Sequence, residues 1–174
     1  MLELSDIQGI VVRGYHTTNA RYSFLSFGST ESAREWVGEA AKLVTDAQEW
    51  QARPQFCVNI ALSYAGLERL GLAVESLSSF PIEFREDLAK RAGTLGDEGA
   101  SAPEHWEGGL GTRDVHALAI IHSNNSDHIQ EQTDVLSDLA DSLVTSRRSL
   151  TGTLPASTAT ANISGTGTDS PPSP

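Results

Sequence analysis

Histidine side chains are the residues of this chain whose chemistry most readily supports a metal site or acid–base catalysis. There are five: His16, His105, His116, His122 and His128. Metal-binding histidines usually lie four residues apart on a helix or close together in a short loop, and no pair here has that spacing. We therefore expect each histidine to be a hydrogen-bonded framework residue, and we assign no metal ligand.

Carboxylates form a second candidate group near the C-terminal end. Glu131, Asp134, Asp138 and Asp141 recur at spacings of three and four, which places them along one face of a helix. Such a row could bind a cation, but it lies opposite a predicted leucine stripe, and exposed like charges cost little in water. We therefore expect a solvated helix face.

The remaining chemical motifs are absent from the sequence. No G-x-S-x-G elbow, P-loop or G-x-G-x-x-G fingerprint occurs, so the motifs give no catalytic residue. Cys57 is the only cysteine, which rules out an internal disulfide, and its strand-like neighbours predict a buried thiol. We assign no catalytic residue, and we leave the cofactor-binding residues unknown.

Charge and composition limit the partners of the chain. Acidic residues outnumber basic ones 23 to 12, for a net charge of −11, with 39% hydrophobic residues. Nucleic acids and anionic membranes require clustered Lys and Arg, so neither is expected as a partner. There is no apolar run of membrane-spanning length and no signal-like N-terminus, so we predict a cytoplasmic protein.

The elements that must position these residues follow from hydrophobic periodicity. The predicted strands span 7–15, 21–28, 55–63 and 115–121, and the two main helices span 29–44 and 127–144. The segment 44–50 is left open between a strand and a turn. The strand over 115–121 is apolar on both faces, which predicts a central strand covered on each side.

Shorter elements fill the region between the last two strands. A short helix follows Ser63 and ends near Gly71, and Pro81 fits a helix first turn. Phe84, Leu88 and Ala92 are predicted to form a buried stripe. The glycine-rich segment 95–114 is predicted to be a loop long enough to be functional or to cover a functional site.

The order of elements predicts an α+β fold. It matches the ferredoxin-like β-α-β-β-α-β unit, an antiparallel sheet with helices packed on one face, plus an extra C-terminal helix. We expect this domain to span residues 1–148. Residues 149–174 are rich in Ser, Thr, Gly and Pro, which predicts a disordered tail.

Three stretches in succession resemble the start of dye-decolorizing haem peroxidases. They are "DIQGIVVRGY", "RYSFLSFGSTESAREWVGEAAKLVT" and "FCVNIALSYAGLERLGL", and the stretch from "SFPIEF" to "DVHALAII" is similar in order and spacing. The resemblance covers residues 5 to 145. It implies one ferredoxin-like half of a two-half enzyme that oxidises dyes and phenolic substrates with hydrogen peroxide, with haem b held mainly by the other half.

The resemblance also implies catalytic parts that this sequence lacks. In the family a G-x-x-D-G motif supplies an acid–base Asp, a nearby Arg polarises the peroxide, and a later His binds the iron. No G-x-x-D-G occurs here; "GTLGDEG", which contains Asp97, has a different spacing. No catalytic residue or iron ligand is transferred from the family to this chain.

These departures lead to three readings of the function. The first is a truncated or frame-disrupted peroxidase half that is inactive, does not bind haem stably alone, and self-associates through the surface left by the missing half. The second is a non-catalytic ferredoxin-like binding or assembly module. The third is another ferredoxin-fold enzyme, of the monooxygenase or chlorite-dismutase kind.

Overall fold

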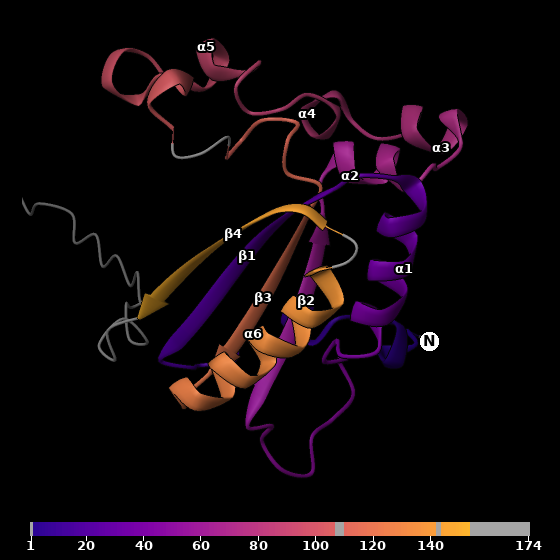
Figure 1. Ribbon diagram of the computed structural model, residues 1–174, viewed down its shortest axis with the longest axis vertical. Helices are drawn as coiled ribbons and strands as arrows, with labels where there is room; N and C mark the ends of the chain where they lie inside the picture. The colour runs from indigo at the N-terminus through magenta and orange to yellow at the C-terminus, as the bar shows by residue number, and fades with distance from the viewer. Residues whose placement is uncertain (1, 107–109, 142–143, 154–174) are drawn as a thin grey trace, which may run out of the picture.

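A four-stranded antiparallel sheet forms the centre of the molecule (Figure 1). The computed structural model describes residues 2–106, 110–141 and 144–153, with side chains up to residue 139. The strands are β1 (Asn19–Phe27), β2 (Phe56–Leu62), β3 (Ala117–Ser123) and β4 (Val144–Thr153), in the spatial order β2-β3-β1-β4. This is the order of a ferredoxin-like sheet, and the predicted α+β class is confirmed.

Two long helices cover one face of the sheet. They are α1 (Thr30–Ala41) and α6 (Ser126–Asp141). In α1 the side chains of Ala33, Trp36 and Ala40 are fully buried, at the helical spacing seen in the sequence. Ser29 caps α1, because its hydroxyl accepts a hydrogen bond from the Ser32 backbone N–H at 3.1 Å.

The hydrophobic core lies between these helices and the sheet. Its buried members are Leu25, Phe27, Ala33, Trp36, Ala40, Val58, Ala117, Ala119, Ile121, Ile129 and Leu136. This cluster stabilises the fold, because removing apolar area from water is worth roughly 25 cal/mol per Å². It fixes the sheet on which the cavities described below are built.

The helix expected as a C-terminal addition is instead the second helix of the ferredoxin-like unit. α6 leads into β4, which pairs antiparallel with β1 in a register that places Thr151 opposite Arg21 and Thr153 opposite Asn19. The predicted domain end at residue 148 was therefore wrong, since Ser149–Thr153 belong to the sheet. The rest of the predicted tail lies outside the described residues.

The N-terminal segment was wrongly predicted as a strand over 7–15. It forms two 3-10 turns, η1 (Leu4–Asp6) and η2 (Gly9–Val11), and a single bridge joins Gln8 to Asp46. The segment 44–50, left open above, is irregular and contains no strand beyond the single bridge at Asp46. The Gln8 side chain accepts from the Ile60 N–H at 3.0 Å and donates to the Ile60 carbonyl at 2.8 Å, so it covers the outer edge of β2.

The second face of the sheet is only partly covered by the described residues. β3 alternates between buried and half-buried positions, and Leu118, Ile120 and His122 lie on the half-buried side. Within the described residues, the expectation of a strand covered on both faces is therefore met on one face only. An apolar pattern predicts that a strand face avoids water, but it does not identify the segment that covers that face.

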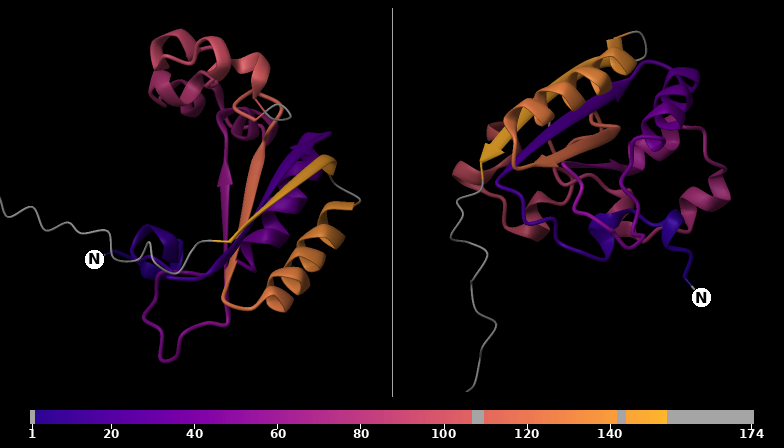
Figure 2. Two further views of the ribbon diagram at one scale, coloured as in Figure 1. Left: turned by 90° about the vertical axis from the view of Figure 1, so that its left-hand side faces the viewer. Right: turned by 90° about the horizontal axis from the view of Figure 1, so that it is seen from below.

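Short helices between β2 and β3 gather beyond one end of the sheet (Figure 1; Figure 2 shows the same cluster from two other directions). They are α2 (Tyr64–Arg69), α3 (Val74–Ser78), α4 (Ile82–Arg85), α5 (Ala92–Leu95), η3 (Gly99–Ser101) and η4 (Pro103–His105). The predicted buried stripe was wrong: Phe84 and Leu88 are 37% and 50% exposed, and only Ala92 is buried. α4 ends at Arg85, so no continuous helix joins the three residues.

Candidate functional site

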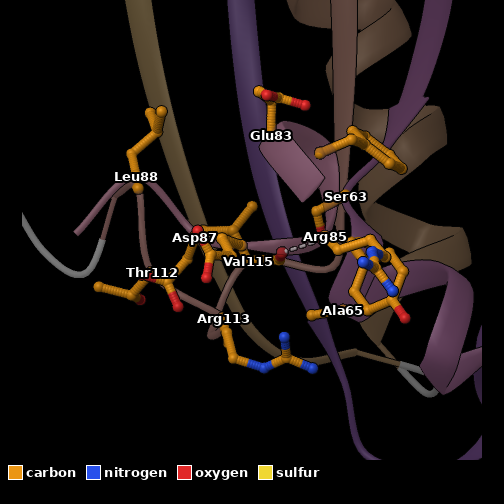
Figure 3. A pocket seen from close by; sticks show the side chains of 13 residues that line it. Ser63, Ala65, Glu83, Arg85, Asp87, Leu88, Thr112, Arg113 and Val115 are labelled. Carbon is orange, nitrogen blue, oxygen red and sulfur yellow. Dashed lines mark hydrogen bonds between the residues drawn. The ribbon is translucent and has the colours of Figure 1, made fainter. Parts of the chain in front are cut away.

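A cavity of about 280 Å³ lies where the short helices meet the end of the sheet (Figure 3). Three segments far apart in the sequence line it: Ser63–Ala65, Glu83–Leu88 and Gly111–Arg113 with Val115. The last of these includes the end of the loop predicted over 95–114. Sequence analysis identified that loop as a candidate functional segment but did not identify the cavity.

The start of α2 is held tightly against the start of β3. The Ser63 backbone N–H donates to the His116 carbonyl at 3.1 Å, and the Ser63 hydroxyl donates to the Val115 carbonyl at 2.6 Å. The same hydroxyl accepts from the Gly66 N–H at 3.0 Å and so caps α2. A methyl group on Gly66 would lie 1.9 Å from the His116 carbonyl oxygen, so this helix reaches the strand only because residue 66 is glycine.

Aromatic and aliphatic side chains form much of the cavity wall. The Tyr64 and Phe84 rings meet edge to face with centroids 6.2 Å apart, and Phe80 packs on Phe84 at 5.1 Å. Leu88 and Val115 complete this side of the cavity. A flat apolar group could therefore be enclosed here.

Charged side chains line the cavity, and most of them have partners. Arg113 pairs with Glu68 and lies 5.8 Å from the centre of the Tyr64 ring, while Glu86 pairs with Lys90 at 2.6 Å. Arg85 differs. Its guanidinium group has no hydrogen bond or ion pair within the described part of the chain, and its Nε atom is buried.

A second cavity of about 300 Å³ adjoins the first, shares Ala65 and Arg113 with it, and includes His116. The His116 Nδ1 accepts a hydrogen bond from the Phe27 backbone N–H at 2.8 Å, and the two rings stack at 5.9 Å. Burial, followed by the nearby Arg69 charge, lowers the pKa of His116. The ring is thus held neutral, with its proton on Nε2.

His122 lies at the other end of β3, on the partly covered face. Its ring meets Tyr15 edge-on at 5.3 Å, and burial lowers its pKa. Its Nδ1 is 3.4 Å from the Thr17 hydroxyl, and its Nε2 is buried without a partner among the described residues. This environment suits a packed framework ring.

The other histidines lie in separate surroundings. His128 contacts Phe56 edge-on at 6.3 Å, His16 has a positive φ of 49°, and His105 is exposed in η4. Over residues 2–106, 110–141 and 144–153, no group of three His, Cys, Asp or Glu side chains is placed to hold a metal ion. Framework roles for the histidines remain a prediction.

The carboxylate row and the cysteine lie where the sequence placed them. Glu131, Asp134 and Asp138 are exposed on α6, which confirms a solvated face for these three, while the Asp141 side chain lies outside the description. Cys57 is 3% exposed, and burial raises the pKa of its thiol. Neither feature provides a reactive site.

The residues of the two cavities do not fit a haem. No histidine lines the apolar cavity, so an iron placed there would lack an imidazole ligand. The second cavity contains His116, whose Nδ1 is already engaged, and its walls include the charged Glu68, Arg69 and Arg113 in place of an apolar slot.

Among the described residues, none of the helices combines the length and the apolar composition that a membrane span requires.

Comparison with known proteins places this geometry in a family. Residues 6–154 match the model of the DyP dimeric alpha+beta barrel domain. "Peroxidase 2" from Mycetinis scorodonius is 25% identical over 155 residues, which cover 87% of this chain and 29% of that protein.

Solved structures of dye-decolorizing peroxidases have the same fold. One in complex with 2,6-dimethoxyphenol aligns with a TM-score of 0.72 at 22% identity, over 88% of this chain and 34% of that one. Another, from Auricularia auricula-judae, aligns with a TM-score of 0.73 at 21% identity, over 87% and 34%. The chain thus spans about a third of the relatives it matches and corresponds to their N-terminal part.

Proposed function

The chain belongs to the family of the DyP dimeric alpha+beta barrel domain, and from that premise we propose that it serves as the N-terminal half of a DyP-type haem peroxidase. The observation that carries the proposal is the family match over residues 6–154, which includes all four strands of the sheet. The whole enzyme would oxidise dyes or phenolic compounds with hydrogen peroxide. Under this proposal the chain contributes the scaffold, and a second half contributes the haem chemistry.

The lack of fit to haem supports this division of labour. The sequence contains no G-x-x-D-G motif, and the two cavities offer no free imidazole in an apolar slot. A peroxidase needs an iron ligand and an acid–base group beside the peroxide. We therefore expect the chain alone to be inactive.

The partly covered face of the sheet is the surface we assign to the second half. Phe24 on β1 and Leu118 and Ile120 on β3 are half-buried apolar residues on this face. These side chains leave apolar area in contact with water, and exposed apolar area favours association with a partner. Alone, the chain should self-associate through this face.

Haem titration of the purified chain tests the proposal. We expect no Soret band of defined stoichiometry with the chain alone, and a Soret band with peroxide-dependent dye oxidation when the C-terminal half of a related peroxidase is added. A stoichiometric Soret band from the chain alone would show that its own histidines bind iron. No complex with the added half, by co-elution, would remove the support for the scaffold role.

Native-state sizing at two concentrations tests self-association. A larger species that grows with concentration is expected. A monomer at both concentrations would show that the half-buried face needs no partner. The cytoplasmic location remains a prediction.

A further inference from the structure

Arg85 presents a cation that the described residues leave without a partner. Its Nε is buried, yet the guanidinium group makes no hydrogen bond or ion pair over the described residues. Arg85 lacks an acidic partner among the described residues although the acidic residues of the chain outnumber the basic ones 23 to 12. A buried donor without an acceptor destabilises the folded state, so the arrangement favours an anionic ligand that satisfies it.

The cavity beside Arg85 limits the size and shape of that ligand. At about 280 Å³ it admits a small molecule, and the Tyr64 and Phe84 rings offer surfaces to a flat apolar group. Phe84 and Leu88 are 37% and 50% exposed, which is costly for apolar side chains unless something covers them. An aromatic ring accounts for both the shape and the exposed apolar walls.

The carboxylates around the cavity limit the charge of the ligand. Glu86 is paired with Lys90, and Asp87 accepts a hydrogen bond from the Lys90 backbone N–H at 2.7 Å. Figure 3 draws the Glu83 carboxylate well above the Arg85 and Arg113 guanidinium groups. The second cation, Arg113, is already paired with Glu68. One uncompensated guanidinium among acidic neighbours suits one negative charge and disfavours two.

We propose that this cavity binds a small aromatic monocarboxylate, with the carboxylate on the Arg85 guanidinium and the ring against Tyr64 and Phe84. Guanidinium and carboxylate groups match in a two-pronged geometry, which makes such pairs among the stronger polar contacts. The proposal does not rest on haem chemistry. Its test needs no haem and no second half, so it can fail while the proposed function stands.

Benzoate is the probe, titrated into the full chain and followed by calorimetry and by the NMR signals of the arginine Nε–H groups. We expect saturation below about 10 mM and a shift of the Arg85 Nε–H signal. Benzyl alcohol, which lacks the charge, and acetate, which lacks the ring, should each bind at least tenfold more weakly. Phthalate, with two charges, should also bind more weakly than benzoate.

The variants are Arg85→Gln and, as the matched control, Arg21→Gln, which removes the same charge from β1 near the opposite end of the sheet. Arg85→Gln should weaken benzoate binding at least tenfold, and Arg21→Gln should leave it unchanged. Equal loss in both variants, no effect of Arg85→Gln, or no saturation with benzoate would each overturn the proposal. If Arg85→Gln fails to fold, the ligand series on the unaltered chain decides, because equal binding of benzyl alcohol and benzoate refutes a role for the charge.

Discussion

Replacing Gly66 with alanine should destabilise the fold, although alanine is the better helix former. The new methyl carbon would lie 1.9 Å from the His116 carbonyl oxygen and 2.8 Å from its carbon. Since Cβ atoms essentially never approach such atoms closer than 3.0 Å, α2 and β3 must separate locally by about 1.1 Å. The obstacle is backbone at the start of a central strand, which cannot rotate out of the way as a side chain could.

The separation would break the contacts that hold α2 in place. The bonds from Ser63 to the His116 and Val115 carbonyls are 3.1 and 2.6 Å long, and an added ångström takes both out of range. Two hydrogen bonds at about 1 kcal/mol each, with about 1 kcal/mol of overpacking, give a cost of about 3 kcal/mol. The helix propensity of alanine offsets about 1 kcal/mol, so the net loss should be about 2 kcal/mol.

Gly38→Ala is the matched control for this substitution. Gly38 also lies inside a helix, α1, but it is exposed, and a Cβ there would meet nothing within 4 Å. Alanine at this position should therefore stabilise the protein by about 1 kcal/mol. The two variants carry the same chemical change and should differ by about 3 kcal/mol, with opposite signs.

Urea unfolding followed by tryptophan fluorescence measures both effects, since the fully buried Trp36 reports on the core. A Gly66→Ala protein as stable as the unaltered chain would refute the reasoning. It would mean that α2 is free to move away from β3, and that the cavity between them is not a fixed feature.

Three further outcomes follow from the described contacts. Burial lowers the pKa of His116 in the folded chain, so below about pH 6.5 the unfolded chain binds more protons. The free energy of unfolding should therefore fall from pH 7 to pH 5, and His116→Asn should reduce that slope; an unchanged slope would contradict the reasoning. The Cys57 thiol, buried and with a raised pKa, should react with a disulfide reagent at pH 8 only after denaturant is added; prompt labelling of the native chain would contradict its burial. Gln8→Glu keeps an acceptor for the Ile60 N–H but has no donor for the Ile60 carbonyl, so the free energy of unfolding in urea should fall by about 1–2 kcal/mol. An unchanged urea midpoint would mean that the Gln8 amide does not protect this edge of β2.

Local patterns in the sequence were sufficient for the framework of the fold. The stripe of Ala33, Trp36 and Ala40 and the cap at Ser29 define α1, and alternation along Phe56–Leu62 defines β2, because each signal arises within one or two turns or a single strand. The ordered succession of such segments was also enough to indicate the family. The exposed position of Glu131 followed from helix periodicity in the same way.

Tertiary structure decided the features that depend on distant partners. The sequence of β4 has no clear alternation of apolar and polar residues. It forms a strand because it pairs with β1 from Val144 to Thr153. The local sequence of the 7–15 segment predicts a strand. The segment instead forms turns, because the Gln8 side chain bonds to Ile60 of β2 and Gly9 packs against the backbone at Asp46. Arg85 carries no local signal, since its cavity forms only when 83–88, 63–65 and 111–115 converge. The hydrophobic periodicity of a helix or strand shows which of its faces avoids water. Which other segment packs on that face depends on contacts between residues that are tens of positions apart in the sequence.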